Sequence, residues 1–155
     1  MPKNKNKILI GRKEEIDLPD LKLKKLNAKV DTGAYTSSIH CHLIETYTRA
    51  GKVLLRFRLL DPEHPNYQRK TFIFRNFSSI RVKSSNGRSE LRYQISTKVK
   101  INEEIFKTEF TLTDRSDMKY PILLGRKFIK QGFIVDVSKY NLAKKKYKIN
   151  ITKDK

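Results

Sequence analysis

The chain has 155 residues, 37% of them hydrophobic and 33% charged, which is enough for one folded domain with one core. No apolar run reaches the length of a membrane-spanning helix, and the first residues lack the apolar stretch of a secretory signal peptide. Cys41 is the single cysteine, so no disulfide framework is expected. These features predict a cytoplasmic protein without a membrane partner.

The chain is strongly basic, with a net charge of +19 from 35 Lys and Arg against 16 Asp and Glu. Such a surface attracts polyanions, although a solvated basic surface without a dedicated partner has the same composition. No RRM, KH or helix-turn-helix signature is present, so a nucleic-acid partner would depend on charge alone.

In chain order, we expect a loose basic arm over residues 1–6, one folded domain over 7–143 and a basic end over 144–155 that holds one alternating strand. Apolar and polar residues alternate in several segments between the two ends, as they do in half-buried strands. In two of these segments one alternating set of residues is expected to face the core. Val53 is the first residue of the set in 52–60, and Leu91 is the first in 91–101. The segments with this alternation are 52–60, 91–101 and 106–112.

The sequence also predicts a hairpin turn, a loop and one short helix. Asn86-Gly87 is the best hairpin turn, because both residues tolerate a positive φ, and residues 61–66 are expected to form a loop. The one persuasive helix is short, running from about Arg126 to Gln131 and ended by Gly132. The sequence therefore predicts an all-β domain with one short helix near the C-terminus.

Asp31-Thr32-Gly33 is the first candidate for chemistry, because an acid stands in a glycine-closed turn after an apolar run. A threonine hydroxyl can lock such a loop, and glycine lets backbone N–H groups approach the carboxylate. The same triplet alone is also an ordinary β-turn.

A second segment, Ile122-Leu123-Leu124-Gly125-Arg126, lies some ninety residues downstream and ends in glycine before the predicted helix. A buried strand of this kind would support the first loop from beneath. Leu124, Gly125 and Arg126 are therefore candidate support residues. The pair of segments in an all-β chain favours a catalytic loop over a chance turn.

These segments resemble the retropepsin-like aspartic proteases, a mostly bacterial family often labelled ATP-dependent zinc proteases of the RimK-associated type. The resemblance covers roughly residues 8–140 and implies a single-lobe β-barrel of the pepsin type. The matching pieces are 10–14 with 18–19, 28–38, 53–57, 84–88 with Glu90, Arg92 and Tyr93, 111–115, and 122–126.

The resemblance implies aspartic proteolysis, in which two carboxylates share a proton and activate water. The sequence holds one D-[S/T]-G, because Asp114, Asp117 and Asp136 lack the following glycine. We therefore expect a homodimer that pairs Asp31 with Asp31 of a second copy. Ala34 cannot donate the hydrogen bond that a serine could give the ionised carboxylate, so we expect activity nearer neutral pH.

A substrate would bind beneath a mobile hairpin, for which Ser85, Asn86, Gly87 and Arg88 are the candidates; an ordinary surface hairpin is the alternative. Arg88, Arg92 and Arg126 could favour acidic substrates. Arg126 could instead hold a dimer by pairing with an acid.

Zinc and ATP have weak support in the sequence, which has neither an H-E-x-x-H motif nor a phosphate-binding Gly-x4-Gly-Lys loop. His40-Cys41-His42 is the nearest metal-like cluster. On a strand His40 and His42 would face one side and Cys41 the other, and His64 is distant in sequence. We expect no metal and no cofactor, and keep a zinc-dependent peptidase as the weakest alternative.

Members of the resembled family often occur beside ligases that add glutamates to the tail of a ribosomal protein. The resemblance thus suggests a glutamate-extended tail as substrate, and the basic surface suits such a peptide. The alternative is a non-catalytic module of the pepsin fold that binds acidic peptide or RNA.

Overall fold

The computed structural model describes residues 6–83, 86–114, 119–145 and 148–150. The fold is all-β, as predicted, with one short α-helix near the C-terminus. None of the helices in these residues is long and apolar enough to cross a membrane. The strands are β1 (Asn6–Ile10), β2 (Lys13–Leu18), β3 (Leu23–Val30), β4 (Ser37–Arg49), β5 (Lys52–Leu59), β6 (Thr71–Phe74), β7 (Ser78–Lys83), β8 (Ser89–Ile101), β9 (Glu104–Thr113), β10 (Ile122–Leu124), β11 (Phe133–Val135) and β12 (Lys148–Asn150); the helices are α1 (Arg126–Ile129) and the 3-10 turns η1 (Pro19–Leu21) and η2 (Ala143–Lys145).

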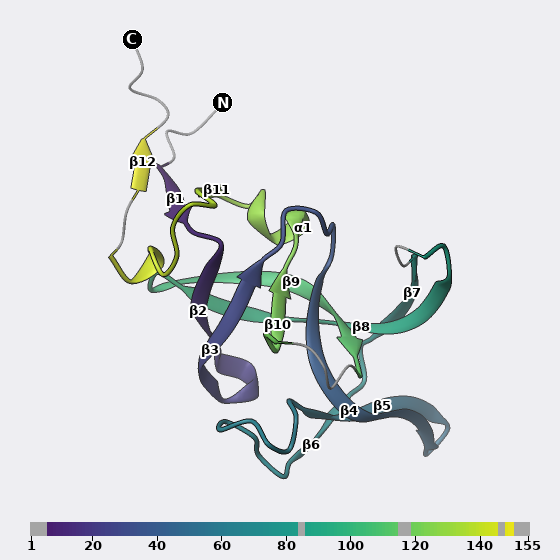
Figure 1. The fold of residues 1–155 in the computed structure, drawn as a ribbon. Coiled ribbons are helices and arrows are strands. Elements are labelled where there is room, and N and C mark those ends of the chain that lie inside the picture. Colours follow the sequence, from purple (N-terminus) through teal and green to yellow (C-terminus); the bar gives the residue numbers. More distant parts are fainter. Residues whose placement is uncertain (1–5, 84–85, 115–118, 146–147, 151–155) are drawn as a thin grey trace, which may run out of the picture.

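The larger sheet closes on itself (Figure 1). Its strand order is β10-β3-β2-β8-β9-β4, and β10 also pairs with β4, so these strands form a complete ring. The short β10 is the strand that closes it, running parallel to β3 and antiparallel to β4. A closed ring leaves its members without open edges and fixes their register.

Two parts of the sheet extend beyond the ring. β5 and β6 continue outward from β4, and β7 pairs with β8 alone. A separate small sheet, β11-β1-β12, brings residues near both chain ends together. The predicted strand near the C-terminus is present as β12, which pairs with β1.

The core fills the ring with aliphatic and aromatic side chains. Leu26, Ile39, Phe110 and Leu124 are fully or almost fully buried, and they come from the four strands that surround the loop after β3. Burial of this kind is worth about 1.5–3 kcal/mol for each large side chain. The core thereby holds that loop in place.

The prediction that Val53 and Leu91 point into the core is wrong. Val53 and Leu91 are 56% and 54% exposed, whereas the later members of the same alternating sets, such as Leu55 and Ile95, are buried. The reason is that the two strands begin in hairpins that extend past the ring, where neither face of the strand meets the core.

Candidate active site

The loop that holds Asp31 follows β3 directly and returns the chain into β4. The N–H of Asp31 donates to the carbonyl of Leu124 at 2.9 Å, which fixes the residue to the closing strand. The N–H of Gly33 donates to Oδ1 of Asp31 at 3.0 Å, and the N–H of Ala34 donates to the Asp31 carbonyl at 3.3 Å. These bonds set the direction of the carboxylate.

Gly125, the glycine at the end of the downstream strand, packs closely against this loop. A Cβ atom built on it would lie 2.7 Å from the carbonyl oxygen of Tyr35 and 2.8 Å from the carbonyl carbon of Thr36. Its N–H donates to Oγ of the fully buried Ser37 at 3.0 Å. The two chain segments therefore meet at a distance that only glycine permits.

Arg126 binds the loop of its own chain. Its N–H donates to the carbonyl of Ala34 at 2.8 Å, and its Nη1 donates to the carbonyl of Thr32 at 3.1 Å. Its guanidinium also lies 5.7 Å from the ring centre of Tyr35. With the Lys127 N–H donating to the Tyr35 carbonyl at 2.9 Å, the start of α1 clamps the loop.

The catalytic candidates remain accessible on this braced loop. Asp31 and Ala34 are half-buried, and Thr32 and Gly33 are exposed. A carboxylate held by backbone bonds and open on its outer side can approach a second carboxylate or a bound water.

Residues 9–146 match the family model described as the RimB-like retropepsin-like aspartic endopeptidases. The chain belongs to this family. A solved structure of a Legionella pneumophila protein of unknown function supports the fold, with a TM-score of 0.69 at 26% identity over 87% of this chain and 97% of that one.

Curated relatives match over a part of their length. Two proteins named probable alpha-L-glutamate ligase, from Shewanella pealeana and Desulfotalea psychrophila, are 37% and 35% identical over 137 and 134 residues. The alignments cover 86% and 84% of this chain but 29% and 28% of those proteins. The RimB-like chain thus spans under a third of these relatives.

The predicted flap lies between β7 and β8. Gly87 has a φ of +86°, as expected for a glycine turn, and the N–H of Arg88 donates to Oδ1 of Asn86 at 3.2 Å. Ser85 lies outside the described residues. In Figure 1 this hairpin extends away from the ring.

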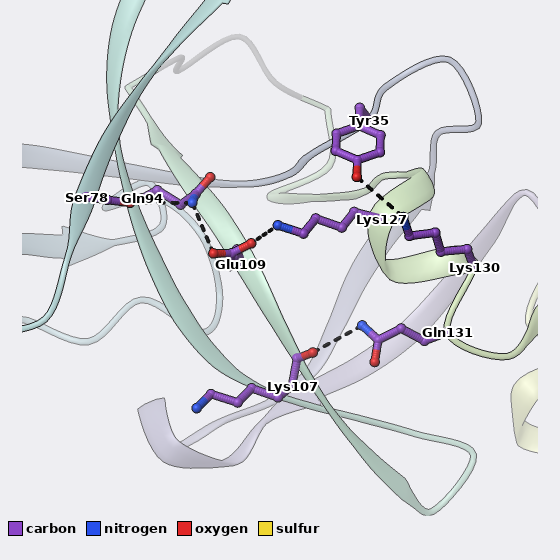
Figure 2. Close-up of polar contacts among 8 residues, drawn as sticks. All are labelled: Tyr35, Ser78, Gln94, Lys107, Glu109, Lys127, Lys130 and Gln131. Atoms are coloured by element: carbon purple, nitrogen blue, oxygen red, sulfur yellow. Dashed lines mark hydrogen bonds and ion pairs between the residues drawn. The ribbon is translucent and has the colours of Figure 1, made fainter.

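A polar network that the sequence did not reveal joins the flap strands to α1 (Figure 2). Glu109 on β9 accepts a hydrogen bond from Nζ of Lys127 and one from Nε2 of Gln94, and Gln94 also contacts Oγ of Ser78 on β7. The hydrogen bond to Glu109 raises the pKa of Lys127. The base of the β7–β8 hairpin is therefore tied to α1, the helix that binds the loop after β3.

His40 and His42 are not arranged as ligands of a zinc site. Both ring nitrogens of His42 have protein partners, the Leu60 carbonyl at 2.9 Å and the Tyr67 hydroxyl at 3.2 Å. Nε2 of His40 lies 3.9 Å from a carboxylate oxygen of Asp61. No three His, Cys, Asp or Glu side chains in the described part of the chain are arranged to hold a metal.

Cys41 is fully buried beside these histidines, and burial raises the pKa of its thiol. His40 is also buried, at 5% exposure.

Proposed function

We propose that this protein is an aspartic endopeptidase that acts as a homodimer, with one Asp31 from each copy in the catalytic dyad. The observation that supports this most is the braced loop itself. The Leu124 carbonyl accepts a hydrogen bond from the Asp31 N–H and the Gly33 N–H donates to the Asp31 carboxylate, while Thr32 and Gly33 stay exposed beside it. A surface turn without function needs no such support from β10 and α1.

The chemistry follows from two carboxylates that share one proton. The ionised Asp31 takes a proton from water, and the water oxygen attacks the carbonyl carbon of the peptide bond. The protonated Asp31 donates its proton to the carbonyl oxygen. When the C–N bond breaks, the leaving nitrogen receives a proton and the two acids return to their shared state.

The second acid must come from another copy, since the sequence contains one D-[S/T]-G. Asp136, another candidate by residue type, is engaged elsewhere, because it accepts hydrogen bonds from the N–H and hydroxyl of Ser138. A twofold axis brings identical residues together, so it would place two Asp31 loops face to face.

For the substrate we propose an acidic peptide, such as a glutamate-extended tail. The net charge of +19 favours such a ligand. The name alpha-L-glutamate ligase, carried by relatives that contain a similar segment, is consistent with a glutamate-rich substrate.

Mixing of active and inactive chains tests the dyad. The assay follows cleavage of a fluorogenic oligo-glutamate peptide after wild-type protein is equilibrated with a tenfold excess of Asp31→Asn. If each dimer needs two aspartates, only about one wild-type chain in eleven keeps a wild-type partner, so activity falls roughly tenfold. An equal excess of Asp136→Asn is the matched control. These chains keep Asp31, so total activity should rise about elevenfold and activity per chain should stay unchanged.

Three results would contradict the proposal. Activity that persists in pure Asp31→Asn would exclude Asp31 as a catalytic acid. Full activity in the mixture would exclude a shared dyad. A chain that binds the peptide without cutting it would be the binding module instead. Preference for a neutral peptide of equal length would overturn only the choice of an acidic substrate.

A further inference from the structure

One face of the strands β4, β5 and β6 carries a row of positive charges, which we call the basic face. Its members are fixed by the strand register: Arg49 pairs with Lys52, Tyr47 with Leu54, Glu45 with Arg56, and Arg56 with Ile73. Side chains alternate between faces along a strand, so these residues share one side with Arg58. Arg75 directly follows β6 and lines the same groove as Tyr47 and Lys52. The opposite side holds Leu55, Phe57 and Phe72, which are buried.

We propose that the basic face binds an extended acidic peptide segment at a site separate from Asp31. The face contains the cations Arg49, Lys52, Arg56, Arg58 and Arg75 and one acid, Glu45, which pairs with Arg56. Among the described residues no acid pairs with Arg49, Lys52 or Arg75. Three positive charges are thus left for a ligand.

The basic face is hollowed, which gives a peptide room to lie on it. A groove of about 570 Å³ is lined by Tyr47, Arg49, Lys52, Leu54, Ile73 and Arg75. Ile73 is 54% exposed in it. A second hollow, of about 310 Å³, continues along β5 past Arg56 and Arg58. The combination of cations at the rim and aliphatic side chains at the base suits a glutamate side chain, which has an anionic end and a methylene stem.

The spacing of the charges indicates an elongated ligand and not a small anion. Lys52, Arg56 and Arg58 stand on one side of β5, and the first and last of them are roughly 20 Å apart at about 3.3 Å per residue. A second extended chain repeats its side chains on one side at the same interval. Because Leu54 lies between Lys52 and Arg56, alternate acidic residues of a bound strand would meet cations at three of the four positions on this side of β5.

The aromatic content of this face favours peptide over single-stranded nucleic acid. Nucleic-acid grooves of this type stack bases on aromatic rings. Tyr47 is the aromatic residue in the groove, and the Arg56 guanidinium already lies 4.8 Å from its ring centre. Phe57 and Phe72 point to the buried side. This face therefore offers little aromatic surface for base stacking, whereas its arginine guanidinium groups can bind carboxylates through paired hydrogen bonds.

The basic face lies far from the catalytic loop. Figure 1 shows the β4–β5 turn at the opposite end of β4 from the loop that holds Asp31. β4 has 13 residues, which places the turn up to about 40 Å from that loop. Peptide binding there does not depend on the proposed cleavage and can be measured without it.

The test uses the full chain with Asp31→Asn, so that no probe is cut. Fluorescence polarisation follows a labelled twelve-residue oligo-glutamate peptide at low salt. The variant Arg49→Gln, Lys52→Gln, Arg75→Gln should weaken binding about fivefold or more, because each exposed ion pair contributes up to about 1 kcal/mol. The control variant Lys24→Gln, Lys98→Gln, Lys139→Gln removes the same charge from other exposed positions and should change affinity less than about twofold.

Each outcome of the binding test either supports or overturns the proposed peptide site. Equal weakening by both triple variants, or no binding of the peptide at all, would overturn the proposal. Tighter binding of a twelve-nucleotide oligouridylate through the same three residues would assign the face to nucleic acid instead. If the triple variant does not fold, Ile73→Asp replaces it. That change puts an acid in the groove at an exposed position and should also weaken peptide binding, whereas unchanged affinity would refute the site.

Discussion

Replacement of Gly125 by alanine should disrupt the loop that holds Asp31 through one methyl group. The new Cβ would lie 2.7 Å from the Tyr35 carbonyl oxygen and 2.8 and 2.9 Å from the carbonyl carbon and oxygen of Thr36. All three atoms belong to the backbone, so no side-chain rotation can relieve the contact. The loop must move away, and the hydrogen bonds from Arg126 and Lys127 to its carbonyls must lengthen.

The expected cost is that of overpacking a buried site, about 1–3 kcal/mol. For a chain of this size, each kcal/mol lowers the melting temperature by about 2–4 °C, so calorimetry should show a drop of about 2–12 °C. Hydrogen exchange gives the local readout: the amide protons of Arg126 and Lys127 should exchange faster than in the wild type.

Gly51→Ala is the matched control. Gly51 has a φ of +77° and nothing within 4 Å of an added Cβ. The substitution should cost about 1–2 kcal/mol through backbone strain alone and leave the exchange of Arg126 and Lys127 amides unchanged. If Gly125→Ala gives the same pattern as this control, the account of Gly125 as the support of the loop is wrong.

Three further predictions concern the buried Glu14 and Cys41 and the half-buried His64. Glu14 is buried and accepts three backbone N–H bonds, two of them from the chain near η2, so Glu14→Gln should lower the free energy of unfolding in urea by about 1–3 kcal/mol; an unchanged value would refute this. Cys41 should react with a thiol reagent only after unfolding, because burial raises its pKa; rapid labelling of the folded protein would contradict its burial. Burial lowers the pKa of His64 from 6.5, so as pH falls through about 6.5 the unfolded chain binds a proton that the folded chain does not, and stability should fall. His64→Asn should flatten this part of the stability-pH curve, and an unaltered slope would exclude His64 as its source.

Local patterns in the sequence were sufficient for the fold class and for the loop that holds Asp31. Alternation along β5, β8 and β9 is a property of neighbouring residues, and it locates strands whatever they pair with. The turn at Asp31-Thr32-Gly33 and the glycine before Arg126 likewise carry their backbone requirements in the residues themselves. Loop support by Gly125 could therefore be predicted before any contact was known.

Long-range contacts could not be predicted in this way. Glu14 bonds to Leu142 and Ala143, 128 and 129 residues away, and a single glutamate in an alternating strand gives no sign of that. The Glu109–Lys127 pair depends on the packing of α1 against β9. Its residues are common surface types, so their identity alone carried no signal.

The two sites make opposite demands on the sheet, and its topology separates them. In the proposed dyad the Asp31 carboxylate must be held to within a fraction of an ångström, and β10 supports its loop by binding β3 on one side and β4 on the other. A charged binding face must be open to solvent, and it can form only where strands leave the ring, as β5 and β6 do. The solvent side of β5 and β6 carries no core, although Leu55, Phe57 and Phe72 are buried on the other side. Its residues are therefore free of packing constraints, and charge can accumulate there at little cost to the stability of the ring.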